Sequence, residues 1–310
     1  MADTTESLKR TIKSAEDLQG VVKTMKALAA VNIRQYQKAV ESLSAYNQTV
    51  SLGFQALLRQ RSADSVIIKK PPPKRIGAIV FGSDQGLCGQ LNAVIAASAM
   101  DEMNALGVRK EDRMVITVGL RLSDYILDAG QPIAEFLATP GSTAGITPLV
   151  QEIMIIMDEW HSKSHVDHFY LYYNHYLSGA TYRPYSLQLL PVNRDWLKKL
   201  EKEKWDSRSL PFFTMDWEAL FSSMIREYLF VSLYRAFAES LASENASRLA
   251  AMQNAEKNIG ERLDELKRLF YRQRQMTITE ELLDVLAGFE AMTEHRRPAK
   301  ASQPTPPERG

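Results

Sequence analysis

The first part of the chain carries apolar residues at a regular helical spacing. Fifteen of them fall between positions 8 and 57, in fourteen steps of three or four residues that average 3.5. That average is the spacing of the buried stripe of a coiled coil, sustained here over seven heptads. At about 1.5 Å per residue such a helix is about 75 Å long, so it needs an equally long partner. The stripe consists of Leu8, Ile12, Ala15, Leu18, Val22, Met25, Ala29, Ile33, Tyr36, Val40, Leu43, Tyr46, Val50, Phe54 and Leu57.

The last part of the chain has the same character. Between positions 217 and 292 only Gly260 and Gly288 interrupt residues that favour helix. Apolar residues recur in steps of three and four from Leu249 to Phe270. Residues 1–70 and 212–297 contain no proline, which permits a long helix at each end. We expect these two helices to lie antiparallel and to bury each other's apolar stripes.

The middle of the chain alternates between two patterns. Short apolar runs at 76–81, 114–118, 169–173 and 187–190 predict strands, and the stretches 92–106, 120–129 and 147–160 predict helices. This alternation favours a parallel sheet of Rossmann-like topology. The expected fold class is therefore α/β, with a long antiparallel two-helix coiled coil and a Rossmann-like domain between its helices. The predicted domains are 1–70 (first helix), 71–211 (α/β domain), 212–292 (last helix) and 293–310, a proline-containing tail expected to be disordered.

Composition narrows the functional classes. Hydrophobic residues make up 45% and charged residues 24% of the 310, as in a folded globular protein. The 38 basic residues nearly cancel the 37 acidic ones, which argues against a nucleic-acid binder. The N-terminus lacks the apolar core of a signal peptide, and no apolar run is long enough to cross a bilayer, so we expect the chain to stay in a bacterial cytoplasm.

A glycine-containing turn follows the first predicted strand, with the sequence SDQGLCGQLN at 83–92. Glycines between a strand and a helix could bind phosphate through backbone amides, but this run matches neither G-x-G-x-x-G nor a P-loop. We therefore favour a tight turn that needs glycine backbone angles, and expect no nucleotide cofactor. Cys88, the only cysteine, could act as a nucleophile beside a histidine but is more simply a buried packing residue.

Two clusters of polar residues invite other hypotheses. His161, His165, His168 and His175 could bind a metal, and His161 and His165 could share one face of a helix. The odd separations of His165, His168 and His175 around a predicted strand place them on opposite faces, so exposed strand-end histidines are expected instead. Lys267, Arg268, Arg272 and Arg274 could bind an acidic partner, or could form the solvated face of a helix. Arg274 and Gln275 supply hydrogen-bond donors suited to a neighbouring protein.

Three stretches, in order along the chain, resemble the gamma subunit of F-type ATP synthases. The family's opening run R-x-I-K-S, followed by Gln and Met-Lys, is matched at Arg10, Ile12, Lys13, Ser14, Gln19, Met25 and Lys26. Its turn S-D-x-G-L-C-G-x-L-N is matched at Ser83, Asp84, Gly86, Leu87, Cys88, Gly89, Leu91 and Asn92. Its last helix is matched by ASENASRLAAMQNAEKN and RQMTITEELLDVLAGFEAM, and with YYNHYLSG and LQLLP the resemblance covers residues 8–292.

The resemblance implies a rotor shaft that performs no chemistry itself and has no catalytic residue, cofactor or metal. Its partners would be the alpha and beta subunits of a catalytic ring, an epsilon subunit and a ring of c subunits. It would bind no nucleic acid and would not insert into the membrane. It would lie at the cytoplasmic face of a bacterial membrane and couple ion flow to ATP synthesis or hydrolysis. The residues implied to contact beta subunits are Met25, Lys26, Arg274, Gln275, Thr279 and Glu280.

The chain also departs from the family pattern. Gly20 and Val22 replace a basic residue and a threonine, and Phe289 follows Gly288 where the family has alanine. Phe270 and Tyr271 replace a Tyr-Asn pair. Together, these departures suggest that the chain belongs to a divergent branch of the family. Two other classes are less favoured. A static coiled-coil scaffold would have no use for polar bands on the helices, and a nucleotide-binding enzyme lacks a phosphate motif here. Co-purification of alpha and beta subunits would separate the rotor from both.

Overall fold

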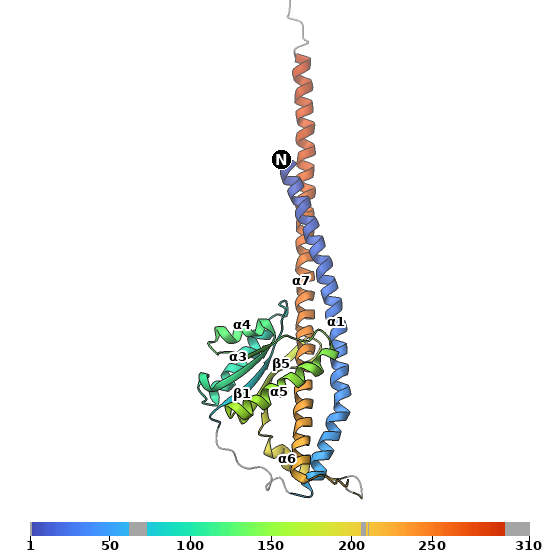
Figure 1. The fold of residues 1–310 in the computed structure, drawn as a ribbon. Helices are drawn as coiled ribbons and strands as arrows, with labels where there is room; N and C mark the ends of the chain where they lie inside the picture. The colour runs from blue at the N-terminus through green and yellow to red at the C-terminus, as the bar shows by residue number, and fades with distance from the viewer. Residues whose placement is uncertain (1, 62–72, 206–208, 210, 295–310) are drawn as a thin grey trace, which may run out of the picture. The chain divides into compact units, whose positions relative to one another are not determined.

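The computed structural model describes residues 2–61, 73–205, 209 and 211–294. The chain divides into two compact units, Met1–Lys23 with Ala255–Gly310, and Thr24–Asn254. Two long helices, α1 (Ala2–Leu58) and α7 (Trp217–Glu294), contribute to both units (Figure 1). The predicted domain limits stay a prediction, and the predicted tail lies outside the described residues from position 295 onward.

In the first unit, α1 and α7 lie side by side. Glu16 of α1 forms an ion pair with Lys267 of α7 at 2.9 Å, and Gln19 lies beside Gly260. Residue numbers fall along α7 as they rise along α1, so the helices are antiparallel. Leu263 and Leu266 are buried, as the apolar spacing of the last helix predicts.

The second unit contains the rest of the helix pair, again antiparallel. Asn32 donates a hydrogen bond to Asn245 at 3.3 Å, Tyr46 donates to Glu227, and Arg61 pairs with Glu218. Two members of the predicted stripe of α1 are nevertheless exposed, Leu18 by 53% in the first unit and Tyr46 by 44% in the second. The physical reason is that an α-helix has 3.6 residues per turn, so a 3.5-residue repeat drifts around it by about 20° per heptad unless the helix supercoils fully.

The sheet of the second unit has the strand order β3-β2-β1-β4-β5. Its strands are β1 (Ile76–Phe81), β2 (Arg113–Val118), β3 (Glu135–Leu137), β4 (His168–Ser178) and β5 (Thr181–Leu190). The first four are parallel in the order 3-2-1-4, which is the order of the first four strands of a Rossmann fold.

The sheet is parallel, as predicted, except at one strand, because β5 runs antiparallel to β4. The two strands are joined by a turn in which Gly179 has a φ of +58°, and a turn this short can only connect antiparallel neighbours. The predicted strands at 169–173 and 187–190 were also too short. The edge strand β3 escaped prediction because it has only three residues, two of them exposed.

Among the described residues, the helices that accompany the sheet are α3 (Leu91–Ala105), α4 (Leu120–Asp128), α5 (Ile146–Ser164) and α6 (Arg194–Lys202). Two short 3₁₀ turns, η1 (Lys110–Asp112) and η2 (Thr143–Gly145), precede β2 and α5. Helix α6 was not predicted. Its N-terminus is capped by Asn193, whose side chain accepts hydrogen bonds from the amides of Asp195 and Trp196.

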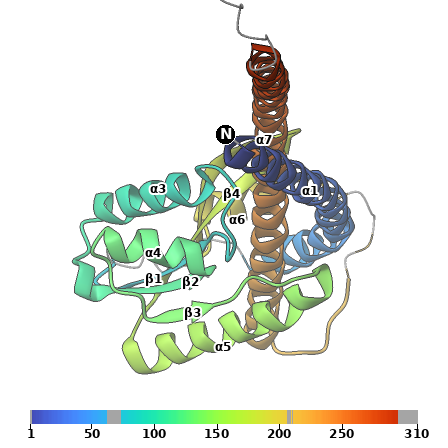
Figure 2. The same cartoon turned by 90° about the horizontal axis from the view of Figure 1, so that it is seen from above.

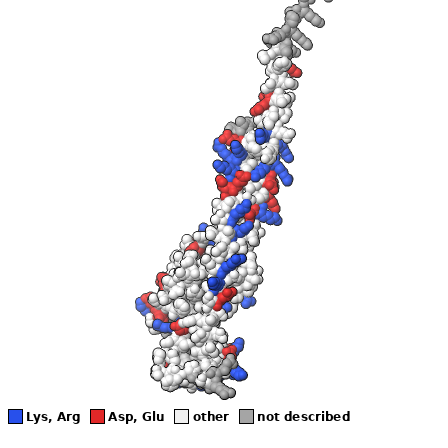
Figure 3. All heavy atoms as spheres, turned by 90° about the vertical axis from the view of Figure 1, so that its right-hand side faces the viewer, with Lys and Arg blue, Asp and Glu red and all other residues white. Residues whose placement is uncertain are grey.

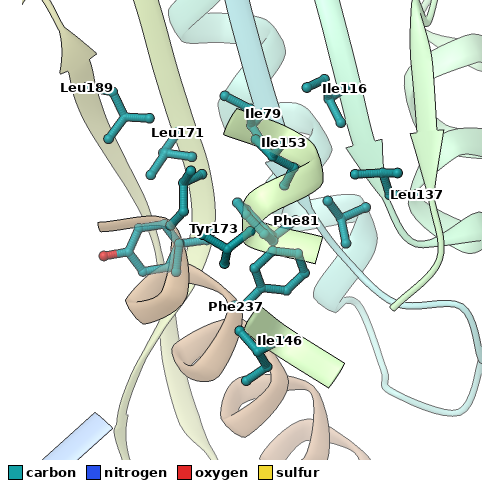
Figure 4. Packing of buried hydrophobic residues seen from close by; sticks show 14 of the residues in the cluster. Ile79, Phe81, Ile116, Leu137, Ile146, Ile153, Leu171, Tyr173, Leu189 and Phe237 are labelled. Carbon is teal, nitrogen blue, oxygen red and sulfur yellow. The ribbon is translucent and has the colours of Figure 1, made fainter. Parts of the chain in front are cut away.

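Alternate residues of β1 belong to two hydrophobic cores, one on each face of the sheet. Ala78 and Val80 pack against α3 and α4 on one face of the sheet, while Ile79 and Phe81 face α5 and α7 on the other (Figure 2). The phenyl rings of Phe81 and Phe237 meet edge to face with their centroids 4.7 Å apart (Figure 4). Helix α7 is therefore part of the core of the α/β domain, and the glycine turn that follows β1 lies next to it.

Candidate functional site

The glycine turn is held together by its own side chains. The amide of Ser83 donates to Asn92 Oδ1 at 3.0 Å, and Asn92 Nδ2 donates back to Ser83 Oγ at 2.8 Å. Ser83 Oγ in turn donates to the Gln85 carbonyl at 2.9 Å. Both Ser83 and Asn92 are buried, so these polar groups need the partners they have. The two residues close the turn between β1 and α3.

Asp84 connects this turn to two neighbouring loops. One carboxylate oxygen accepts from the amide of Leu120 at 2.8 Å, at the start of α4. The other accepts from the amide and the hydroxyl of Thr139, at 2.8 and 2.7 Å, just after β3. A single carboxylate therefore joins the loops that follow β1, β2 and β3 at the carboxyl edge of the sheet.

The expectation that both glycines supply special backbone angles is correct for only one of them. Gly89 has a φ of +58°, in the region that favours glycine. Gly86 does not lie in that region, and Leu87 adopts a φ of +63° instead. Open space surrounds the position that a Cβ of Gly86 would take, so its side-chain volume is not restricted there.

Cys88 is a packing residue of the turn. Its side chain is buried, and its thiol lies 3.4 Å from Ser83 Oγ and 3.7 Å from the Gln85 carbonyl. Neither group is a general base, so nothing in these contacts activates the thiol. The expected absence of nucleotide binding stays a prediction, which calorimetric titration with ATP and NAD would test.

A row of buried polar residues on α7 holds the domain against that helix. Glu239, Ser243 and Ser247 are spaced by four residues and so lie on one face. Ser247 Oγ donates to the carbonyl of Cys88 at 2.6 Å, and Ser243 Oγ donates to the carbonyl of Asn174 at 2.8 Å. The helix thus bonds directly to the glycine turn and to β4.

Glu239 completes this row with charged partners. Its carboxylate accepts from Arg235 Nε at 2.6 Å and pairs with Nδ1 of His175 on β4. This row of polar residues was not predicted from the sequence. The signal was present as a run of small and polar residues, ESLASENASR, inside a helix expected to be buried.

The expectation of exposed histidines is wrong for two of the four. His168 is buried at the start of β4, and His175 is half-buried against Glu239, because β4 lies between two strands instead of at an edge. His161 and His165 are exposed, as expected. Among the described residues no group of three or more histidine, cysteine, aspartate or glutamate side chains could hold a metal ion.

A second polar pair lies on α7 next to α1. Glu244 accepts from Arg248 at 2.7 Å, and both side chains are almost fully buried. Burial raises the pKa of the Glu244 carboxyl, while the Arg248 guanidinium opposes that shift. Burial also raises the pKa of the Tyr36 hydroxyl on α1, and the neighbouring Glu244 adds to this effect. Within the described part of the chain, Glu244 Oε2 and Arg248 Nε have no hydrogen-bond partner.

The predicted contact residues fall in different units. Met25 and Lys26 are half-buried on α1 in the second unit. Arg274, Gln275 and Thr279 are exposed on α7 in the first unit, and Glu280 beside them is half-buried. The basic residues Arg268, Arg272 and Arg274 are exposed, consistent with a solvated helix face, while Lys267 pairs with Glu16.

The final turns of α7 differ from the rest of the helix. Every residue from 281 to 290 is exposed, although five of them are large and apolar: Leu282, Leu283, Val285, Leu286 and Phe289. No lysine or arginine occurs between positions 275 and 294. Figure 3 shows charges of both signs gathered where α1 and α7 pair in the first unit. The surface of α7 from there toward its C-terminal end is mainly uncharged. Apolar surface of this extent is typical of a protein interface.

Comparison with known proteins extends this description. A family model described as "ATP synthase" matches residues 4–292. The ATP synthase gamma chain of Nitrosomonas eutropha is 26% identical over 290 residues, which cover 92% of this chain and 98% of that one. The gamma chain of a Nostoc species is 29% identical over 317 positions, covering 93% and 99%.

Solved structures show the same fold. A chain of the Euglena gracilis mitochondrial ATP synthase, from an OSCP/F1/c-ring complex, aligns over 98% of this chain and 100% of its own length with a TM-score of 0.69 at 19% identity. A chain of the Tetrahymena thermophila central stalk and c-ring covers 76% of this chain and 99% of its own length, with a TM-score of 0.55 at 23% identity. In the described part of the chain, no helix has the length and apolarity needed to span a bilayer. With nearly its whole length matched by the family model and by named gamma chains, the chain belongs to the gamma-subunit family of F-type ATP synthases.

Proposed function

We propose that this chain is the rotor shaft of an ATP synthase and performs no chemistry itself. Its partners are a catalytic ring of alpha and beta subunits, an epsilon subunit and a ring of c subunits in the membrane. The shaft couples ion flow through the membrane sector to ATP synthesis or hydrolysis. It is a peripheral protein at the cytoplasmic face of a bacterial membrane.

The observation that carries this proposal is the uncovered end of α7. Residues 281–290 are all exposed, and half of them are large apolar side chains that burial would stabilise. A static scaffold that presents only the α/β domain has no need for such an end. A shaft whose end is enclosed by surrounding subunits buries these side chains in the assembly.

Coupling requires that the chain favour different conformations of its neighbours in different orientations. A shaft achieves this only if its contacts differ in free energy between orientations. It also needs the α/β domain to turn together with the helices. The hydrogen bonds from Ser243 and Ser247 to backbone carbonyls of the domain support this, because they hold α7 to β4 and to the glycine turn.

We further propose that Arg274 and Gln275 form a polar catch that binds a beta subunit. Both side chains are exposed, and together they offer guanidinium and amide donors. A carboxylate on the neighbour would bind Arg274 more strongly than solvent-exposed side chains bind each other, since the contact would be partly desolvated. Thr279 and Glu280 extend this surface by one turn, and Met25 with Lys26 provide the contact on α1.

The test is the double variant Arg274→Ala, Gln275→Ala in the assembled complex. We expect the isolated chain to fold as before, because both side chains are exposed, and ATP-driven ion pumping in inverted vesicles to fall at least about fivefold. Arg121→Ala, at an exposed arginine of α4, is the matched control and should pump like the parent. Parental assembly and pumping by the double variant would show that the catch hypothesis is wrong for this chain.

Met25→Lys tests the contact on α1. The added charge would pair with acidic groups of a beta subunit and hold the shaft too tightly in one orientation. We expect ATP hydrolysis to continue while ion pumping falls, so the ratio of pumping to hydrolysis is the quantity to measure. An unchanged ratio would remove Met25 from the proposed contact surface.

A further inference from the structure

An open pocket of about 680 Å³ lies within the second unit, at the amino edge of the sheet, and is lined mainly by polar and charged residues. Its walls come from the segments 73–75, 107–112 and 164–165, which lead into β1, β2 and β4. These three strands are parallel neighbours in the sheet, so the segments that precede them lie together. The glycine turn follows β1 and therefore lies at the opposite edge of the sheet.

Ion pairs and hydrogen bonds join the three segments. Arg75 donates from Nη1 to the carbonyl of Ser164 at 3.1 Å, and its Nε lies 3.6 Å from Oδ1 of Asp112. The loop before β2 is also fixed from the inside of the domain, because the buried Arg113 guanidinium donates to the Val108 carbonyl at 2.9 and 2.6 Å. The walls of the pocket are thus held in place before a ligand binds, which lowers the entropic cost of binding.

The pocket carries more positive than negative charge. Among the described residues that line it, Lys74, Arg75 and Arg109 are cationic, and Asp112 supplies the one carboxylate. Both arginines share this carboxylate, since Arg109 pairs with its Oδ2 at 2.7 Å and Arg75 approaches its Oδ1. With the histidine of the lining neutral, these groups leave an excess of two positive charges. Glu111 is exposed and lies outside the lining, so it offsets this excess only in part.

Each of the three cations keeps hydrogen-bond donors that no other group uses. Within the described part of the chain, no partner binds the Lys74 ammonium, Nη2 of Arg75 or Nη1 of Arg109. An anion that accepts from these donors leaves both ion pairs of Asp112 intact. Guanidinium groups match the oxygens of phosphate particularly well, and hydrogen bonds between charged groups are stronger than those between neutral groups.

From this geometry we propose that the pocket binds a phosphate group as its dianion. Two negative charges match the excess of the lining, and the phosphate oxygens accept from the ammonium and from both guanidinium groups. Among the described residues of the lining there is no phenyl, phenol or indole ring on which a base could stack, so the site selects the phosphate group and not a nucleotide. Inorganic phosphate and the head group of phosphatidate both carry this chemistry. The proposal does not rest on the proposed rotor function.

The first experiment titrates the full chain with inorganic phosphate at constant ionic strength and about pH 8, where phosphate is mainly a dianion. NMR of the backbone amides follows the binding. We expect saturable shifts of the Gly107 and His165 signals, while the Gly179 signal, from the turn between β4 and β5, should not shift. Acetate, which carries one charge, should bind at least about tenfold more weakly. Equal affinities for the two anions, or shifts that do not saturate, would overturn the proposal.

Two variants of equal charge separate this pocket from the rest of the surface. Lys74→Gln with Arg109→Gln should weaken phosphate binding at least about tenfold, because two of the three cations are lost. Lys257→Gln with Arg262→Gln removes the same charge from exposed positions of α7 and should not change the binding. Unchanged binding by the first variant, or an equal loss in the second, would also overturn the proposal.

Vesicles distinguish the two sources of the phosphate group. The chain is sedimented with vesicles of phosphatidylcholine, with and without phosphatidate. Binding that needs phosphatidate and is lost in the Lys74→Gln, Arg109→Gln variant would identify the lipid as the source, whereas saturable binding of inorganic phosphate alone would identify the free anion. Failure of both probes would overturn the proposal. Phosphate buffer in the calorimetric titration with ATP keeps this pocket filled, so the test of nucleotide binding stays independent.

Discussion

The side chains of the glycine turn bond mainly to backbone groups of nearby loops. Asp84 accepts three hydrogen bonds from two loops, and Ser83 and Asn92 bond to each other in both directions. Groups that are paired in this way are costly to remove, because the partner left behind stays desolvated without a hydrogen bond. At the scale of single residues, the hydrogen bonds of the family motif therefore account for the structure of these loops.

Asp84→Ala tests this explanation. The substitution leaves the amides of Leu120 and Thr139 without their acceptor, and we expect the free energy of unfolding to fall by about 2–3 kcal/mol. Urea denaturation of the isolated chain measures the change. Asp101→Ala, at an exposed position of α3, should change the free energy of unfolding by less than about 0.5 kcal/mol. A similar small effect for both variants would contradict the structural role of Asp84.

The buried Glu244 carboxyl should make the free energy of unfolding depend on pH. Burial raises the pKa of its carboxyl in the folded chain above the ordinary value of the unfolded chain. Between these two pKa values the folded chain binds more protons than the unfolded chain. The contribution of Glu244 to the free energy of unfolding is therefore present below the unfolded pKa and is lost as the pH rises through the folded pKa. We expect Glu244→Gln to remove this part of the pH dependence of the free energy of unfolding. Urea titrations at several pH values would show it, and an identical pH profile for the variant and the parent would contradict it.

At the scale of elements, α7 changes its role along its length. From 241 to 248 every residue is buried, between the α/β domain and α1, whereas from 281 to 290 every residue is exposed. In between, the stripe of Met252, Leu263 and Leu266 is buried. The α-helical backbone is the same throughout, so the surroundings of each stretch, and not its propensity, decide what it contributes.

Met252→Asp tests the buried stripe. Met252 is 2% exposed, and an aspartate there would bury an unpaired charge. We expect a loss of about 3–5 kcal/mol in the free energy of unfolding, seen as a fall in the melting temperature. Gln253→Asp adds the same charge at the exposed neighbouring position and should leave the melting temperature nearly unchanged. Equal melting temperatures for the two variants would exclude this stripe from the core.

At the scale of the whole molecule, stability is distributed unevenly between the parts of the chain. The second unit contains a five-stranded sheet with a hydrophobic core on each face. The described end of α7 has no buried residue after Leu266. Regions with few buried contacts open at low free energy, and regions within the core open only with the whole domain.

Hydrogen exchange of the isolated chain should reveal this difference. We expect the amides of residues 281–290 to exchange at least about 100-fold faster than those of 241–248. In the assembled complex the slow exchange of 241–248 should persist, and exchange at 281–290 should slow markedly because surrounding subunits cover that stretch. Fast exchange of 281–290 in the complex would contradict the proposal that the end of α7 is enclosed.

Local pattern was enough to predict the elements whose signal is strong and continuous. The two long helices and β1, β2 and α3 to α5 followed from periodicity and from the placement of proline, and the glycine turn followed from its position between β1 and α3. The antiparallel pairing also followed, because two apolar stripes of such length have few other ways to be buried. Apart from the pairing, these features depend on residues close together in the sequence.

Only the tertiary structure decided the features that depend on distant partners. The direction of β5 follows from its pairing with β4, and β3 is a strand only because β2 lies beside it. The polar residues of α7 are buried because Cys88, Asn174 and His175 bring hydrogen-bonding groups to them from other parts of the chain. The pocket at the amino edge of the sheet exists for the same reason, since its walls come from segments that lead into three different strands. A sequence pattern reports which side chains avoid water, but hydrogen-bond partners and cavity walls are set by which segments meet in space.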